Sequence, residues 1–184
     1  MTQKIGIIYS SVDGQTKKIC EKLYQLLKDE QITTELYSIE EFNQVLSKYH
    51  TLIIAASIRY GTHNKKINEF IVYNKHSLSK IQTAFFSVNL VARKKDKSSP
   101  STNPYMVKFL DTIKWKPNFL EVFAGKLDYK SYPFFDRIMI KLIMKFTKGP
   151  TKTEKPIEYT DWKKVTNFGL RIAENFKKTK QNTI

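Results

Sequence analysis

Short apolar runs recur along the chain and predict a buried parallel sheet. Residues 5–9, 51–56 and 83–88 carry no charge, and uncharged runs of this length are typical of strands covered on both faces. Residues 33–39 favour a further short strand, and residues 120–127 form the last strong strand pattern of the chain. The sequence therefore predicts five strands.

Amphipathic segments separate these runs and predict helices. In the first segment Ile19, Leu23, Leu26 and Leu27 fall on one helical face, with Lys and Glu elsewhere. We expect further helices at residues 40–46 and 66–74, after the cap pair Asn103-Pro104, and from about Thr160 and Asp161 onward. This alternation predicts an α/β fold: a flavodoxin-like doubly wound five-stranded parallel sheet with helices on both faces, in a single domain over residues 1–184.

The junction between the first strand and the first helix has the composition of an anion site. Its residues are small, polar or hydroxyl-bearing: Ser10, Ser11, Val12, Asp13, Gly14, Gln15 and Thr16. The first helical N–H groups have no partner within the helix, so they favour an anion together with the helix dipole. The segment is neither a P-loop nor a dinucleotide fingerprint. Hydroxyl groups in their place suit the phosphomonoester of FMN, whereas the alternative is that they merely cap the helix.

Two further loops are expected at the same edge of the sheet. They are Ser57, Ile58, Arg59, Tyr60 and Gly61, and Ser87, Val88, Asn89, Leu90 and Val91. Ligands of doubly wound sheets bind outside the carboxyl ends of the strands, at the point where the strand order reverses. We therefore expect the first loop to hold a phosphate and these two to flank a flat ring.

A long segment interrupts the chain between the last strand and the last helix. Residues 129–158 form this insertion, and residues 133–146 within it predict a helix that is apolar except for a basic stripe. The stripe is Arg137, Lys141 and Lys145, and the apolar positions include Phe134, Ile138, Leu142 and Met144. At about 1.5 Å per residue such a helix is too short to span a bilayer. The pattern favours a helix in the membrane interface, although added core or a homo-oligomer contact would also use it.

The amino-acid composition limits the classes of partner that the protein is expected to bind. The formal net charge is +15, which favours an anionic partner: nucleic acid, an anionic membrane surface or an acidic small substrate. Cys20 is the single cysteine, which excludes an internal disulfide and indicates a reducing compartment. His50, His63 and His76 lack metal-ligand spacing, and we expect His63 to be solvated. We expect neither a signal peptide nor a spanning helix.

Four motifs in order resemble one known family. They are A-S-I-R-Y-G (56–61), F-F-S-V-N-L-V-A-R-K (85–94), D-R-I-M-I-K-L-I-M-K (136–145) and Y-T-D-W (159–162). Together they resemble menaquinone-dependent protoporphyrinogen IX dehydrogenase, the flavodoxin-fold enzyme of bacterial haem synthesis. The resemblance implies bound FMN, oxidation of protoporphyrinogen IX, delivery of electrons to a membrane quinone, and a peripheral position on the cytoplasmic side of the inner membrane.

The resemblance also implies roles for single residues. Arg59 becomes the candidate catalytic residue, since a cation near the flavin stabilises its anionic reduced form; otherwise it is a surface cation. Arg93 and Lys94 become candidate partners of the substrate propionates, or else part of a solvated basic loop. Tyr60 either stacks on the ring or covers an edge of the core.

Three other functions compete with this interpretation. An NAD(P)H:quinone oxidoreductase on the same fold would need a nicotinamide site, for which the sequence shows no fingerprint. The charge of +15 and the apolar insertion speak against a flavodoxin-type electron carrier. We expect no dedicated nucleic-acid function, because the basic residues are spread over many helices without a recognition motif.

Overall fold

The computed structural model describes residues 4–146, 149–153 and 155–181. Its main sheet has the strand order β2-β1-β3-β5-β6, and all four neighbouring pairs in this order are parallel. The strands are β1 (Ile5–Ser10), β2 (Thr34–Ser38), β3 (Thr51–Arg59), β5 (Gln82–Asn89) and β6 (Phe119–Ala124). The doubly wound parallel sheet predicted from the sequence is confirmed, with the order reversing between β1 and β3.

A sixth strand was not predicted. The third strand of the chain continues three residues beyond its apolar run and turns back as β4 (Thr62–His63), which pairs antiparallel with the end of β3. Tyr60 and Gly61 form the turn with φ angles of 49° and 79°. Ser57, Ile58 and Arg59 therefore lie on a hairpin rather than in a free loop.

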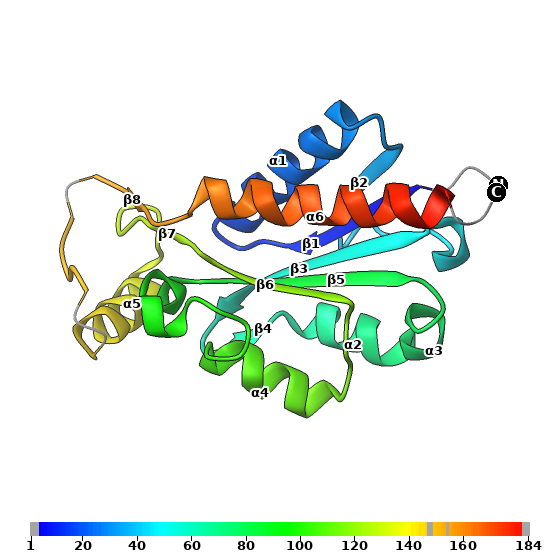
Figure 1. Ribbon diagram of the computed structural model, residues 1–184. Coiled ribbons are helices and arrows are strands. Elements are labelled where there is room, and N and C mark those ends of the chain that lie inside the picture. The colour runs from blue at the N-terminus through cyan, green and yellow to red at the C-terminus, as the bar shows by residue number, and fades with distance from the viewer. Residues whose placement is uncertain (1–3, 147–148, 154, 182–184) are drawn as a thin grey trace.

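Helices cover both faces of the sheet (Figure 1). On one face lie α1 (Gln15–Asp29) and α6 (Trp162–Gln181), and on the other α2 (Lys65–Tyr73), α3 (Lys75–Leu78) and α4 (Pro104–Ile113). The predicted cap at Asn103 is confirmed: its side chain accepts hydrogen bonds from the N–H groups of Tyr105 and Met106. The last helix begins where expected, and the side chain of Asp161 accepts a hydrogen bond from the N–H of Lys164.

The helix predicted at residues 40–46 is wrong. This segment is a turn followed by extended chain, and only a short 3-10 helix, η1 (Leu46–Lys48), forms after it. The carbonyl of Ser38 accepts from the N–H groups of Glu41 and Phe42, and the Phe42 ring packs edge-on against Tyr37. The chain therefore closes a single turn here, and the edge contact between Phe42 and Tyr37 holds that turn against β2.

The core forms one apolar layer on each side of the sheet. Ile7, Ile53 and Phe86 face α1 and α6, whereas Ile54 and Phe85 face α2, α3 and α4. All five are fully buried, and burial of each such side chain contributes about 1.5–3 kcal/mol. The two layers hold the strands rigidly, so the positions of their carboxyl ends are fixed.

The insertion leaves and rejoins the domain at one place. Strand β7 (Lys126–Leu127) pairs antiparallel with β8 (Ile157–Glu158), and helix α5 (Phe134–Phe146) lies between them. Leu127, Tyr129, Tyr132 and Met144 form a small separate cluster beneath α5. The predicted helix is confirmed, and it lies at the carboxyl end of the sheet (Figure 1). Residues 147, 148 and 154 of the insertion lie outside the described residues. Every helix in the described ranges is too short or too polar to cross a bilayer.

Candidate active site

Three chain segments meet where the strand order reverses. In the register of the sheet Ser10 pairs with Ala56, and Ser57 pairs with Val88, so the segments that follow leave the sheet side by side. Together with α5 they line a pocket that opens to solvent. We call it the flavin pocket, after the FMN that the sequence predicts at this edge of the sheet. Residues lining it that were predicted from the sequence are Ser11, Asp13, Gln15, Thr16, Ser57, Ile58, Arg59, Tyr60, Gly61, Val88, Asn89, Leu90 and Val91.

The loop before α1 is built as an anion site. Gly14 caps the helix with a φ of 80°, a left-handed conformation that favours glycine, and no side chain bonds to the first helical N–H groups at this cap. The capping alternative is therefore wrong for this loop. The hydroxyl oxygens of Ser11, Thr16 and Ser57 are buried and have no hydrogen-bond partner among the described residues. Since buried polar atoms are nearly always paired, these orphaned hydroxyls, two of them at the start of α1 and one on β3, fit the oxygens of a phosphomonoester.

The hairpin is joined to the strand beside it by a buried histidine. His63 was expected to be solvated, but only 6% of its surface is exposed. Its Nε2 lies 2.9 Å from the hydroxyl of Ser87, and its ring packs against Phe85 and Phe109. Burial lowers the pKa of His63 to about 4. Ser87 therefore anchors the hairpin and does not line the flavin pocket, contrary to its predicted contact with the ring.

The segment after β5 is fixed by two interlocked amides. The side chain of Asn89 accepts hydrogen bonds from the N–H of Ala92 at 3.0 Å and from the amide of Asn103 at 3.2 Å. Asn103 also donates to the carbonyl of Lys97 at 2.9 Å. The segment continues as the 3-10 helix η2 (Leu90–Arg93). These bonds hold Val88, Leu90 and Val91 as a rigid apolar wall of the pocket.

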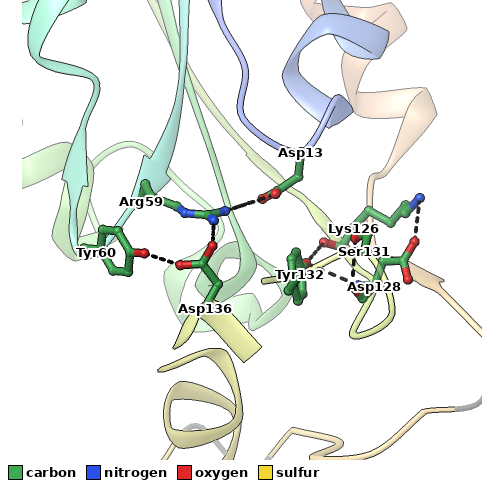
Figure 2. Close-up of polar contacts among 8 residues, drawn as sticks. All are labelled: Asp13, Arg59, Tyr60, Lys126, Asp128, Ser131, Tyr132 and Asp136. Carbon is green, nitrogen blue, oxygen red and sulfur yellow. Dashed lines mark hydrogen bonds and ion pairs between the residues drawn. The ribbon is translucent and has the colours of Figure 1, made fainter. Parts of the chain in front are cut away.

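The side chain of Arg59, on the hairpin, bonds both to the loop before α1 and to the insertion (Figure 2). Its Nη1 donates to the two carboxylate oxygens of Asp13 at 3.0 and 3.2 Å, and its Nη2 donates to Asp136 of α5. The hydroxyl of Tyr60 donates to the other oxygen of Asp136, and the Tyr60 ring lies 5.6 Å from the guanidinium carbon. One cation therefore bridges the anion loop, the hairpin and the insertion.

The return of the insertion is bonded to the helix that follows the anion loop. Gln15 donates to the hydroxyl of Thr160 at 2.9 Å, and Thr160 donates to the carbonyl of Ala124 at 2.7 Å. Glu158 accepts from Lys18 at 2.9 Å and from the indole of Trp162 at 2.6 Å. The hydrogen bond from Lys18 is the main cause that lowers the pKa of Glu158. These contacts fix the floor of the site beside Gln15.

Some predicted site residues lie elsewhere. Val12 is exposed, and Ser10 is buried at the end of β1; neither is among the described residues that line the pocket. The same holds for Arg93 and Lys94, so their contact with substrate stays a prediction. Arg93 donates to the carbonyl of Leu90 at 2.9 Å and lies over the Tyr159 ring.

The wall of the pocket that the insertion supplies was not predicted from the sequence: Tyr132, Asp136, Met139, Ile140 and Ile143. Tyr105, Gly125 and Lys126 lie outside the insertion and also line the pocket without having been predicted. Burial raises the pKa of the Tyr132 phenol, whose oxygen bonds to the backbone of Lys126 and Asp128. One signal was present: Asp136 is the single acid within residues 134–146.

Helix α5 has two different faces. Asp136, Ile140 and Ile143 face the pocket, and Met144 is fully buried in the cluster beneath the helix, so its predicted place in a membrane is wrong. Arg137 is half-buried and donates to the carbonyl of Tyr132 at 3.2 Å. The opposite face is exposed and apolar: Phe134, Phe135, Ile138, Leu142 and Phe146.

Comparison with known proteins identifies the family. The flavodoxin domain family matches residues 6–154. The Escherichia coli (strain K12) protein named protoporphyrinogen IX dehydrogenase [quinone] is 42% identical over 171 residues, which are 92% of this chain and 94% of that protein. The chain belongs to the flavodoxin-domain family of protoporphyrinogen IX dehydrogenases. A Leishmania major protein of the same name is 42% identical over 92% of this chain and 74% of its own length.

Solved structures agree on the fold of this protoporphyrinogen IX dehydrogenase family member. A flavodoxin from the domain Archaea matches with a TM-score of 0.52 at 11% identity, over 95% of this chain and 99% of that one. The Flv1 flavodiiron core from Synechocystis sp. PCC6803 matches with a TM-score of 0.57 at 11% identity, over 97% of this chain and 37% of that one. The family predicted from the four motifs is confirmed, and the flavodoxin domain confirms FMN as the cofactor.

Proposed function

We propose that this protein binds one FMN in the flavin pocket and uses it to oxidise protoporphyrinogen IX to protoporphyrin IX, with a quinone as electron acceptor. The observation that carries the proposal is the 42% identity, over 92% of the chain, to a dehydrogenase named for this substrate and acceptor. The pocket supports the proposal in two ways. The unpaired hydroxyls of Ser11, Thr16 and Ser57 form a site for the phosphate, which we call the phosphate corner, and the insertion supplies one wall.

The side chains of the pocket fit FMN. The orphaned hydroxyls of Ser11, Thr16 and Ser57 and the free N–H groups at the start of α1 would bind the phosphate. A flavin held there would supply two-electron redox chemistry, and three successive losses of a hydride and a proton would convert the porphyrinogen to the porphyrin while the acceptor takes up the electrons. Arg59 and Tyr60, held at the pocket edge, would orient the ring and stabilise negative charge on it. Leu90, Val91 and Ile140 would exclude water from the reacting atoms.

The substrate carries propionate groups that need cations. Lys126 lines the pocket, although it also pairs with Asp128 at 3.3 Å. Arg93 and Lys94 follow the wall formed by Leu90 and Val91, and we propose that they meet a propionate that extends beyond the pocket mouth. A net charge of +15 also favours the approach of an anionic substrate.

We further propose that the exposed face of α5 docks on an anionic membrane surface, which brings the pocket to a membrane quinone such as menaquinone. Phe134, Phe135 and Phe146 are 68%, 79% and 84% exposed on this face, an arrangement that is costly in water and suited to the acyl boundary of a bilayer. Lys141 and Lys145 lie along it and can meet lipid phosphates. A homo-oligomer contact through the same face is the alternative occupant.

Anaerobic turnover tests the reaction. Purified protein loaded with FMN should convert protoporphyrinogen IX to fluorescent protoporphyrin in the presence of a soluble menaquinone analogue. The same protein should be reduced only slowly by NADPH. Rapid reduction by NADPH together with no reaction of protoporphyrinogen would replace this proposal with an NAD(P)H:quinone oxidoreductase.

A further inference from the structure

The polar contact that reaches the site from α5 comes from a single buried acid. Asp136 is the one acid among residues 134–146, and its side chain is 7% exposed. Its neighbours on the pocket side of the helix, Met139, Ile140 and Ile143, are apolar. A carboxylate buried in apolar surroundings is costly unless it is paired, so its partners indicate what holds it there.

Both carboxylate oxygens of Asp136 bind residues of the hairpin. One accepts from Nη2 of Arg59 and the other from the hydroxyl of Tyr60 (Figure 2). The second acid on Arg59, Asp13, has a side chain that is 40% exposed. Because water screens the pair with Asp13 more strongly, Asp136 is the stronger constraint on the guanidinium.

We propose that Asp136 is a positioning residue for Arg59 and Tyr60, and that the same carboxylate clamps α5 over the flavin pocket. The inference rests on the proposed function, since it concerns the same site. The carboxylate orients the guanidinium and offsets part of its charge. The positive charge that Arg59 presents to bound FMN is therefore set by a residue of the insertion, and the position of the insertion is set by the arginine.

The isosteric variant Asp136→Asn removes the negative charge of the side chain and keeps its size and shape. In the protein without FMN, hydrogen exchange of the α5 amides should become about tenfold faster, because the ion pair that holds the helix is lost. In the protein with FMN, the preference for reduced over oxidised flavin should rise about tenfold, since Arg59 keeps more of its charge. For a two-electron couple that change equals about +30 mV in midpoint potential. The matched control is Asp111→Asn, which removes an exposed acid paired with Lys114 on α4 and should change neither quantity.

A second variant changes Arg59, the partner of Asp136 in the same ion pair. Arg59→Gln should also speed exchange in α5, and the double variant Arg59→Gln with Asp136→Asn should exchange no faster than the faster single variant. Additive effects, or wild-type exchange in both single variants, would overturn the clamp. Wild-type potential in Asp136→Asn with normal FMN binding would overturn the positioning role alone. Failure of the wild type to bind FMN would instead overturn the proposed function, while exchange in the unloaded protein would still decide whether Asp136 holds α5.

Discussion

His63 and Ser87 join the flavin-site hairpin to the central sheet, with Nε2 and Oγ 2.9 Å apart. The two residues come from β4 and from β5, which are not neighbours in the sheet. Their contact fixes the turn that presents Arg59 and Tyr60 to the pocket. The buried imidazole also makes the fold sensitive to acid.

We expect His63 to destabilise the fold as the pH falls. Its pKa is about 4 in the folded protein and about 6.5 in an unfolded chain, so protons bind the unfolded chain first. The full stability is present above pH 6.5 and falls by about 1.4 kcal/mol per pH unit down to pH 4, a loss of about 3 kcal/mol. Urea unfolding of the protein without FMN at several pH values measures this slope. His63→Gln should make the slope shallower, although burial also lowers the pKa of His50, which adds a slope of the same sign. His76→Gln, at an exposed position on α3, should keep the wild-type slope. Equal slopes in the wild type and His63→Gln would contradict the assignment.

The phosphate corner predicts a selective loss of FMN affinity. Ser11→Ala and Thr16→Ala each remove one buried hydroxyl, and a hydrogen bond to a charged group contributes about 1.5–3 kcal/mol. FMN binding should therefore weaken about ten- to hundredfold per substitution, as measured by quenching of flavin fluorescence. Riboflavin lacks the phosphate, so its weaker binding should not change. If the wild type binds riboflavin as tightly as FMN, the phosphate does not bind at this corner.

Arg59→Ala should slow protoporphyrinogen oxidation at least tenfold, because the cation that stabilises negative charge on the ring is lost. The variant also leaves Asp136 buried without its ion-pair partner, so its unfolding free energy must be measured beside its rate. Arg171→Ala is the matched control, since Arg171 lies on the exposed side of α6. A folded Arg59→Ala protein that turns over at the wild-type rate would remove Arg59 from the mechanism.

Helix α5 predicts salt-dependent binding to anionic vesicles. Lys141→Glu with Lys145→Glu reverses two charges beside the exposed apolar face, and each cation near an anionic surface contributes about 1 kcal/mol. The double variant should stay in the supernatant when the wild type sediments with the vesicles. Arg137 is left unchanged because it bonds to the backbone of Tyr132.

The control for this experiment is Lys65→Glu with Lys66→Glu, which reverses two exposed charges on α2 and should sediment like the wild type. Turnover with a short-chain quinone should survive in the α5 variant, because the chemistry lies in the pocket. Equal sedimentation of the α5 variant and the wild type would exclude the membrane role. A concentration-dependent dimer that the α5 variant abolishes would assign the face to a second copy of the chain.

The sheet could be predicted because its strands are buried on both faces. Runs such as residues 51–56 contain no charge, so the side-chain pattern alone reveals them. The hairpin could not be predicted in this way. Ser57 and Arg59 interrupt the apolar run, and the turn uses Tyr60 at a φ of 49°, a conformation that a tyrosine does not signal.

In the site, too, features formed by neighbouring residues could be predicted from the sequence, whereas contacts between distant residues could not. The anion loop is continuous in sequence, so its hydroxyls and Gly14 could be recognised together. The contact between Arg59 and Asp136 joins residues 77 positions apart, and no local pattern reports it. His63 was misjudged because a short polar stretch predicts exposure, whereas the aromatic rings of Phe85 and Phe109 enclose it.

The pairing of β7 with β8 closes the insertion at its base, so the insertion could be exchanged as a unit. Lys126 lies opposite Glu158 and Leu127 opposite Ile157, so the chain leaves and re-enters the domain about 5 Å apart. The segment between them has its own small core, and a short turn could close the gap without moving any strand of the main sheet. Exchange of the insertion would leave the phosphate corner intact and replace one wall of the pocket. On the proposed role of α5, such an exchange would change the surface on which the protein docks and keep the site of the cofactor.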